Sequence, residues 1–347
     1  MTLASLRRRL PAIPPVVLDA ILYAASALFA VLLWYGSSLS AHRDWSRDAI
    51  VGYLACAAVA VVLAVVRPRR LLEARVALVG VCVLVCAVLP LVLMVRERAA
   101  SHGREVHVLP EAAVIERAGA RLAHGRDPYV AEVVDGRLVG QVAGVPKYEA
   151  FFPYFPLMAV LGLPASVSAF GIMGDARWWM ALVTFLCLAA GLVLARPPPD
   201  RALRLGQAML ALPTGALFLA GGGDDLPVLA VCFLGLCLAQ RRREVASGVC
   251  FGIAMAMKLT AWPLAALTLF VVRDRHGRHA AGRAGAVMAS IVGVVLVPFL
   301  AWDPRTFLAN CLEFPLGLSP INSPAADPLP GHLLTVLVPG AHRVLLV

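Results

Sequence analysis

Long apolar runs separated by short charged segments dominate this sequence. The first three runs cover residues 17–37, 50–66 and 75–95, and further runs follow after residue 153. Each is long enough to cross a hydrocarbon core of about 30 Å as an α-helix. The pattern predicts an all-α, polytopic membrane protein with about 7–10 transmembrane or re-entrant helices.

The composition agrees with that pattern. The chain is 60% hydrophobic and 15% charged, whereas a soluble domain is nearer half apolar and a quarter charged. The net charge of +10 comes largely from arginine clusters that flank the apolar runs. Such clusters are expected in cytoplasmic loops. Since no basic stripe is interleaved with aromatic residues, we do not expect nucleic-acid binding.

The basic clusters also predict the orientation of the chain. The clusters at 7–9 and 67–70 favour the cytoplasm. They predict that the N-terminus and the loop after the second span lie on the cytoplasmic side. By parity, the polar stretch 96–153 is then a large extracytoplasmic loop after the third span. We therefore expect three N-terminal spans in 1–95, an extracytoplasmic loop at 96–153, and a membrane domain in 154–347.

The apolar stretch 154–172 has two interpretations. As a membrane span it would place the basic segment QRRRE (240–244) outside, against the charge rule. Pro156 and Pro164 interrupt the stretch, and two prolines weaken a simple span. We prefer a juxtamembrane or re-entrant pair of short helices, which returns the basic segments to the cytoplasm.

A second break is expected in the stretch 247–272. Both of its flanks, QRRRE and RDRHGRH, are basic and favour the cytoplasm, yet the stretch is too short for two full spans. Lys258 and Pro263 interrupt it, so two half-helices that meet at KLTAWP satisfy both constraints. A last apolar run then leads to a Pro-rich extracytoplasmic loop at 302–331.

One short amphipathic helix is expected inside the extracytoplasmic loop, at residues 110–124. A proline and a glutamate, Glu111, suit its positive start, and a glycine suits its end. In helical projection Glu111 falls on the same stripe as Ile115 and Ala118. Glu111 is therefore either a residue that favours the helix start, or a carboxylate aimed at a membrane-edge cavity where it acts as a general base.

Two features beside Glu111 have simpler interpretations. Glu116 lies on another side of the helix, and we expect it to be solvated. The helix ends in GRDPY, where Asp127 precedes a proline and is pushed out of the helical region. Physical chemistry alone predicts a helix stop and a turn there.

Further charges stand at the edges of apolar runs. Asp224 and Asp225, in GGGDDLPVLA, either cap a helix or belong to a site. Lys258 either reaches the membrane interface or faces water and binds an anionic phosphate. Asp44 and Asp48 are expected to be solvated loop charges.

The cysteines and histidines indicate no metal centre. Seven of the eight cysteines fall within or at the edge of apolar runs, and none forms a CxxC pair. His107 and His124 match no zinc-ligand spacing. We expect no cofactor, and the sequence requires no divalent metal.

Four stretches occur in order between residues 111 and 263: EAAVIERAGARLAHGRDPY, PKYEAFFPYFPLMAVLGLP, GGGDDLPVLA and SGVCFGIAMAMKLTAWP. Together they resemble the polyprenyl-phosphate-sugar-dependent glycosyltransferases of GT-C architecture, specifically the alpha-1,2-mannosyltransferase-like family (glycosyltransferase family 87). The resemblance places the catalytic carboxylate about eighteen residues before the tyrosine of the Gly-x-x-Pro-Tyr turn. Counting back from Tyr129 gives Glu111, although relatives carry Asp there and have the loop after the first span.

The resemblance implies a reaction and a set of site residues. The donor would be a polyprenyl monophosphate sugar such as mannose or arabinose, and Glu111 would deprotonate a lipid or glycan acceptor hydroxyl that attacks C1 with inversion. The departing phosphate needs a facing cation; Lys258 is the first candidate, followed by Arg117, Arg121 and Lys147. The substrate pocket would include Asp127, Tyr129, Tyr154, Asp224 and Asp225.

The implied setting is the plasma membrane, with an extracytoplasmic active site and a role in glycolipid or cell-envelope synthesis. The partners are membrane lipid, the lipid-linked donor and a glycolipid or glycan acceptor; no nucleotide site is needed, in line with the missing Gly-rich fingerprints. Two alternatives stay open. A transporter or lipid flippase also suits broken helices and an intramembrane lysine, although no inverted repeat is visible. A catalytically silent homologue would carry Glu111 without using it.

Overall fold

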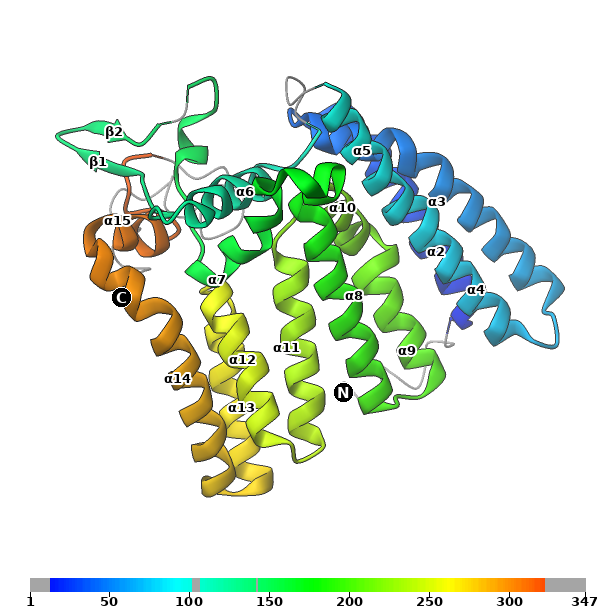
Figure 1. Cartoon of the computed structure of the whole chain (residues 1–347). Helices are drawn as coiled ribbons and strands as arrows, with labels where there is room; N and C mark the ends of the chain where they lie inside the picture. The colour runs from blue at the N-terminus through cyan, green and yellow to red at the C-terminus, as the bar shows by residue number, and fades with distance from the viewer. Residues whose placement is uncertain (1–12, 102–106, 142, 322–347) are drawn as a thin grey trace, which may run out of the picture. The chain divides into compact units, whose positions relative to one another are not determined.

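The computed structural model describes residues 13–101, 107–141 and 143–321 (Figure 1). This described part is almost entirely helical, with one antiparallel pair of short strands, β1 (Glu132–Val134) and β2 (Arg137–Val139). By length and composition, five of its helices can cross a membrane, or up to seven if each of two bent pairs counts as one span. The predicted all-α polytopic membrane fold is confirmed.

The chain forms two compact units. The first contains Met1–Leu109 and Arg196–Leu226, and the second contains Pro110–Ala195 and Pro227–Val347. The basic cluster at 7–9 and residues 322–331 of the expected loop 302–331 lie outside the described residues.

The first unit is built around the three N-terminal spans that the sequence predicts. Its helical segments are α2 (Pro15–Gly36), α3 (Ser40–Val66), α4 (Leu71–Val83), the π-helix η1 (Leu84–Val88), α5 (Leu89–Ala100), α9 (Pro199–Gly206), the π-helix η5 (Gln207–Ala211) and α10 (Pro213–Gly221). The segments α4, η1 and α5 follow one another without a gap, so residues 71–100 form a single long span.

One expectation for this unit is wrong. The segment SAHRDWSRDA, predicted to be a loop, forms the first turns of α3. The Asp44 carboxylate lies 2.7 Å from Nδ1 of His107, and Asp48 pairs with Arg47. The two aspartate side chains are only 18% and 14% exposed, so they are not solvated loop charges. The polar residues enter the helix because they have polar partners there: His107 for Asp44, and Arg47 for Asp48, with Arg47 also pairing with Glu97 of α5.

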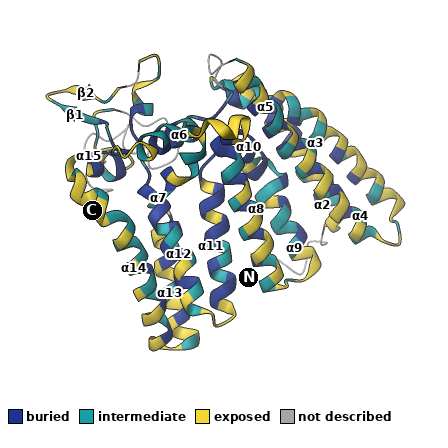
Figure 2. Ribbon diagram, in the orientation of Figure 1, coloured by how far each residue is buried: buried dark blue, intermediate teal, exposed yellow. Residues whose placement is uncertain are grey.

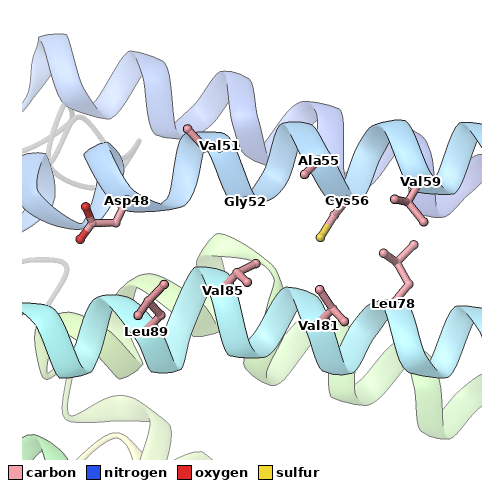
Figure 3. Close-up of a pocket in the computed structure, with 10 residues that line it drawn as sticks. All are labelled: Asp48, Val51, Gly52, Ala55, Cys56, Val59, Leu78, Val81, Val85 and Leu89. Carbon is pink, nitrogen blue, oxygen red and sulfur yellow. The ribbon is translucent and has the colours of Figure 1, made fainter.

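The π-helix η1 has a physical cause in Pro90. A proline inside a helix cannot bond the carbonyl four residues earlier, here that of Cys86. The indole Nε1 of Trp45 donates to that carbonyl at 2.9 Å, which connects α3 to the long span. Residues of α3 and the long span also line an open, mostly apolar pocket of about 340 Å³, with Cys56 among its aliphatic side chains and Asp48 at one end (Figure 3).

The second unit contains the remaining described segments. They are α6 (Pro110–Ala123), β1, β2, the 3-10 helix η2 (Lys147–Ala150), α7 (Pro156–Ala159), the 3-10 helices η3 (Val160–Ser166) and η4 (Ser168–Gly174), α8 (Ala176–Ala195), α11 (Asp225–Gln240, which begins in the first unit), α12 (Glu244–Met257), α13 (Ala261–His276), α14 (Arg278–Trp302), α15 (Pro304–Leu308) and the π-helix η6 (Ala309–Glu313).

The stretch 154–172 is not one straight helix. The segments 156–166 and 168–174 are bent by 115° relative to each other. Pro156 opens the first of them, and Gly171 has a backbone conformation outside the helical region. The predicted pair of short helices is confirmed. Its relation to the membrane stays a prediction.

The break at Lys258 is also confirmed. Helix α12 ends at Met257 and α13 begins at Ala261, so the two run as a hairpin (Figure 1). Ala239 and Ala280 contact Val272 in one buried cluster, which brings the α11–α12 and α13–α14 turns together. Both basic flanks therefore lie at the same end of the hairpin, as the charge pattern requires. Helix α14 covers it with a largely exposed outer surface (Figure 2).

Candidate functional site

Helix α6 presents an apolar face to the short helix η3. Ile115, Ala118 and Gly119 are buried on this face, and Glu111 lies half-buried in its first turn. The helix spans Pro110–Ala123, close to the predicted 110–124. Ile115 and Ala118, which the helical projection places on the same stripe as Glu111, are thus buried on the packed face.

Two glycines allow α6 and η3 to touch backbone to backbone. A Cβ on Gly119 would lie 2.4 Å from the Gly162 carbonyl carbon, and one on Gly162 would lie 2.1 Å from the Ile115 oxygen. No larger residue fits at either position without moving a backbone. This contact fixes α6, and with it the first turn that carries Glu111.

Glu116 has a different role from the expected one. Its Oε1 accepts the backbone N–H of Ala176 at 3.0 Å, at the start of α8. The prediction of a solvated charge is wrong because an N-terminal N–H of α8 lacks a partner within its own helix and needs an acceptor.

Tyr148 lies within electrostatic reach of Glu111. Burial, together with the negative charges of Glu149 and Glu111, raises the pKa of the Tyr148 hydroxyl. Tyr148 belongs to η2, beside the exposed Lys147. The segment 147–150 therefore faces the start of α6.

The two arginines of α6 hold neighbouring loops. Arg117 donates to the backbone oxygen of Glu149 at 3.0 Å and pairs with its carboxylate at 3.1 Å. Arg121 donates through Nε to the backbone oxygen of Asp127 at 2.6 Å. The N–H groups of Arg117 and Arg121 therefore hydrogen-bond η2 and the GRDPY turn, and hold these segments in position.

The GRDPY turn is closed by its own aspartate. Asp127 Oδ1 accepts the backbone N–H of Tyr129 at 2.9 Å, which is the Asx-turn geometry. Burial raises the pKa of the Asp127 carboxyl, and the nearby Asp303 charge adds to the effect, whereas the Tyr129 N–H and Arg121 oppose it. Asp127 is thus a half-buried acid that shapes the turn.

Three of the stretches quoted for the resemblance meet around Tyr154. The Tyr129 hydroxyl donates to the Tyr154 backbone oxygen at 2.9 Å. The Lys258 ammonium lies 5.4 Å from the centre of the Tyr154 ring, a cation–π arrangement. The backbone N–H of Phe155 donates to Met257 at 3.0 Å. The turn, the aromatic stretch and the helix break therefore form one connected cluster.

Asn310 was not identified from the sequence, and it connects the same cluster to α15 and η6. Its side chain is fully buried, donates to the Ala131 and Thr306 backbone oxygens at 2.7 Å each, and accepts the Phe152 N–H at 2.8 Å. The segment looked like a Pro-rich loop, so no periodicity marked this residue. The residue type was the one signal in the sequence, because an asparagine amide that is buried needs several hydrogen-bond partners.

Asp224 and Asp225 belong to the first unit. Asp224 is buried and Asp225 exposed at the start of α11, after Gly222 with φ 94° closes α10. The backbone N–H of Leu109 donates to Gly221 at 2.8 Å, directly before this turn. The site residues that the structure brings together in the second unit are Arg121, Asp127, Tyr129, Tyr154 and Lys258.

No group of three or more His, Cys, Asp or Glu side chains within the described ranges could hold a metal ion.

The sequence was compared with known protein families, curated proteins and solved structures. Residues 151–346 match the model of glycosyltransferase family 87, which covers more than half of the 347 residues. Tyr154, Asp224, Asp225 and Lys258 lie within the matched range, whereas α6 with Glu111 precedes it. No curated protein and no solved structure matches the chain.

Proposed function

Because this chain belongs to glycosyltransferase family 87 and is therefore a glycosyltransferase, we propose that it moves a sugar from a polyprenyl monophosphate to a lipid or glycan hydroxyl. A lipid-linked donor suits a helical membrane protein, since donor and catalyst share the bilayer. Mannose is the sugar we assign first. We place the reaction at the extracytoplasmic face of the plasma membrane, the side given to α6 by the basic clusters.

Glu111 is the general base of this proposal. It takes the proton of the acceptor hydroxyl while that oxygen bonds to C1 and the bond from C1 to the phosphate oxygen breaks. Attack opposite the leaving group inverts C1. The positive start of α6 favours the ionised carboxylate, and the Gly119–Gly162 contact holds it in a fixed place.

The observation that carries the proposal is the cluster of Tyr129, Tyr154 and Lys258. The departing lipid phosphate gains negative charge, so a positioned cation lowers the barrier to its departure. Lys258 follows the end of α12 at a helix break, beside an aromatic ring that orients its ammonium group. The exposed Lys147 is a second cation for the same substrate, whereas Arg117 and Arg121 position loops.

The test is sugar transfer by the reconstituted full-length protein. Wild type and Glu111→Gln would be given radiolabelled polyprenyl phosphate mannose and a set of glycolipid acceptors, with Glu73→Gln on the exposed start of α4 as control. We expect the Glu111 variant to lose about two to four orders of magnitude in rate, and the control to keep the wild-type rate.

A second arm separates the base from the cation. Lys258→Met should lower transfer strongly, whereas Lys147→Met should change it less. Persistent transfer by Glu111→Gln would remove Glu111 as the base. Absence of transfer from every donor tried would favour a catalytically silent protein, and donor movement across the membrane without transfer would favour a transporter.

A further inference from the structure

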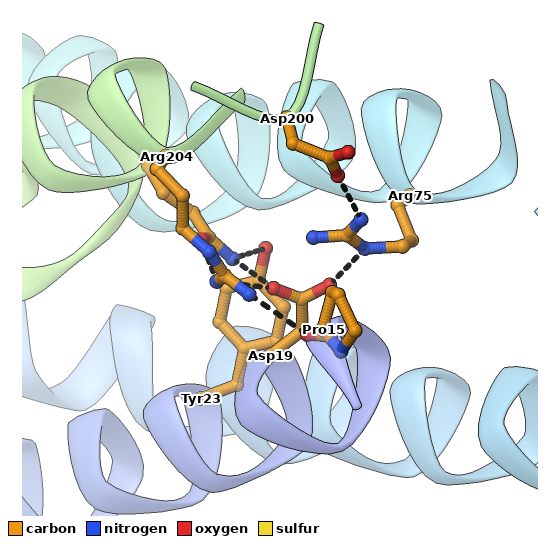
Figure 4. A network of polar contacts seen from close by, with 7 residues as sticks. Pro15, Asp19, Tyr23, Arg75, Asp200 and Arg204 are labelled. Atoms are coloured by element: carbon orange, nitrogen blue, oxygen red, sulfur yellow. Dashed lines mark hydrogen bonds and ion pairs between the residues drawn. The ribbon is translucent and has the colours of Figure 1, made fainter. Parts of the chain in front are cut away.

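Four charged side chains and one amide form a polar network with a buried centre at one end of the first unit (Figure 4). They are Asp19 of α2, Arg75 of α4, Asp200 and Arg204 of α9, and Gln207 of η5. Asp19 is 2% exposed and accepts from Arg75 at 2.6 Å, from Arg204 at 2.5 Å and from Gln207 at 3.0 Å. Gln207 also donates to the Tyr23 hydroxyl.

The network lies close to the ends of two membrane-crossing helices. Asp19 follows the start of α2 by four residues, and Arg75 follows the start of α4 by four. With a rise of 1.5 Å per residue, each lies about 6 Å inside its helix. Both helices qualify as membrane spans. In helices that cross a hydrocarbon core of about 30 Å, we expect residues this near an end to lie close to the lipid headgroups.

Arg75 offers an anion-binding edge that an exposed carboxylate covers. Its Nη1 donates to Asp200 Oδ1 at 2.8 Å, and the Asp200 side chain is 65% exposed. Its Nη2 is buried and has no hydrogen-bond partner among the described residues, while the Arg75 side chain is 4% exposed. The Nη1–Nη2 edge of a guanidinium fits two phosphate oxygens at once. Asp200 thus occupies part of the place that a phosphate would take.

The surroundings are positively charged. Within the network, the negative charges of two aspartates balance the positive charges of two arginines. The turn before α4 and the start of α9 add exposed arginines, namely Arg67, Arg69, Arg70 and Arg201, of which Arg70 pairs with Glu73. Basic residues at a membrane surface attract anionic lipids, with roughly 1 kcal/mol for each Lys or Arg near it.

We propose that the Nη1–Nη2 edge of Arg75 binds the phosphate of an anionic membrane lipid, with Asp200 turning away into solvent to admit it. The depth of the network favours a lipid headgroup over free phosphate. The site belongs to the end of the first unit that carries the basic cluster 67–70.

The test measures lipid-dependent stability of the full-length protein in detergent micelles. The thermal unfolding midpoint would be followed during titration with phosphatidylglycerol, phosphatidylcholine or inorganic phosphate, because a ligand that binds the folded state raises that midpoint. Wild type would be compared with Asp200→Asn, Arg75→Lys and the exposed control Arg69→Gln.

Phosphatidylglycerol alone should raise the midpoint of the wild type. Asp200→Asn should lower the half-saturating concentration severalfold, because the variant lacks the competing charge. Arg75→Lys should raise that concentration about tenfold, because it loses the second donor, whereas Arg69→Gln should raise it clearly less, because it removes only one charge of the surrounding attraction. If Arg75→Lys does not fold, the Asp200→Asn comparison decides alone.

Three results would overturn the proposal. One is an Asp200→Asn titration equal to or weaker than wild type. Another is an equal effect of inorganic phosphate, which would make free phosphate the ligand. The third is an equal loss in Arg69→Gln and Arg75→Lys, which would indicate diffuse attraction rather than a site.

Discussion

The Tyr129 hydroxyl donates a hydrogen bond to the backbone oxygen of Tyr154, 2.9 Å away. Tyr129 is 2% exposed and ends the GRDPY turn, whereas Tyr154 carries the ring beside Lys258. One hydroxyl therefore connects a loop that follows α6 to the cation of the candidate site. Burial raises the pKa of Tyr129 well above its ordinary value, so this hydroxyl keeps its proton and remains a donor.

Removal of the Tyr129 hydroxyl should destabilise the cluster moderately, because one hydrogen bond is lost while the packing of the ring is kept. In Tyr129→Phe the ring keeps its contacts with Phe152 and Phe307, but the Tyr154 carbonyl loses the hydroxyl donor and keeps the weaker thiol donor Cys311 at 3.3 Å. We expect a loss of about 1 kcal/mol in unfolding free energy, measured as a lower thermal midpoint. Tyr35→Phe, at an 86% exposed tyrosine of α2, is the matched control. Equal midpoints for the two variants would contradict the role of the hydrogen bond.

Substitution of Asn310 should destabilise the protein far more than substitution of its neighbours. Asn310→Leu leaves the Phe152 N–H and the Ala131 carbonyl without their side-chain partner in a buried place. Each such group costs roughly 1–3 kcal/mol, so the variant should lose about 3 kcal/mol or more. Leu308→Ala, in α15 at a 40% exposed side chain, should lose well under half of that. Thermal unfolding of the two variants in the same detergent measures both losses of stability. Comparable losses would contradict a stabilising role of the Asn310 amide.

The features that the sequence predicted share a local cause. The spans follow from hydropathy, α6 from its end residues and apolar stripe, and the break at Lys258 from the basic flanks of a stretch too short for two spans. The position of Glu111 on the packed face of α6 needed only the helical repeat. Its role as base stays a prediction, as do the roles of the other candidate site residues.

The features that the sequence did not predict depend on distant pairs. Asp19 meets Arg75 and Arg204, which are 56 and 185 residues away. Asn310 meets Phe152 across 158 residues, and Glu116 meets the start of α8 across 60. No periodicity encodes such pairings. The one available hint was that ionisable residues inside a span need a partner, which applies to Asp19 without naming Arg75.

The glycine contact between α6 and η3 predicts a sharp size limit. Gly162→Ala would place a methyl group 2.1 Å from the Ile115 oxygen, so the backbones of α6 and η3 must move apart. We expect a loss of about 1–3 kcal/mol in stability and a fall in transfer rate, because Glu111 moves with its helix. Gly80→Ala is the control: this α4 glycine has nothing within 4 Å of an added Cβ, and alanine favours a helix. Full activity of Gly162→Ala at wild-type stability would show that the contact does not position Glu111.

Asp127 should make stability fall as pH rises. Burial and the Asp303 charge raise the pKa of its carboxyl above the ordinary 3.8, so the folded protein binds this proton more tightly than the unfolded chain. The stabilisation is fully present below the unfolded pKa, and it is lost as pH rises through the folded pKa.

Asp127→Asn keeps an oxygen to accept the Tyr129 N–H but carries no charge. Relative to wild type, the thermal midpoint of Asp127→Asn should therefore increase between pH 4 and pH 7. Asp135→Asn, at the exposed tip of the β1–β2 hairpin, should show no such trend. A constant difference between Asp127→Asn and wild type across this range would mean that the Asp127 charge does not oppose folding.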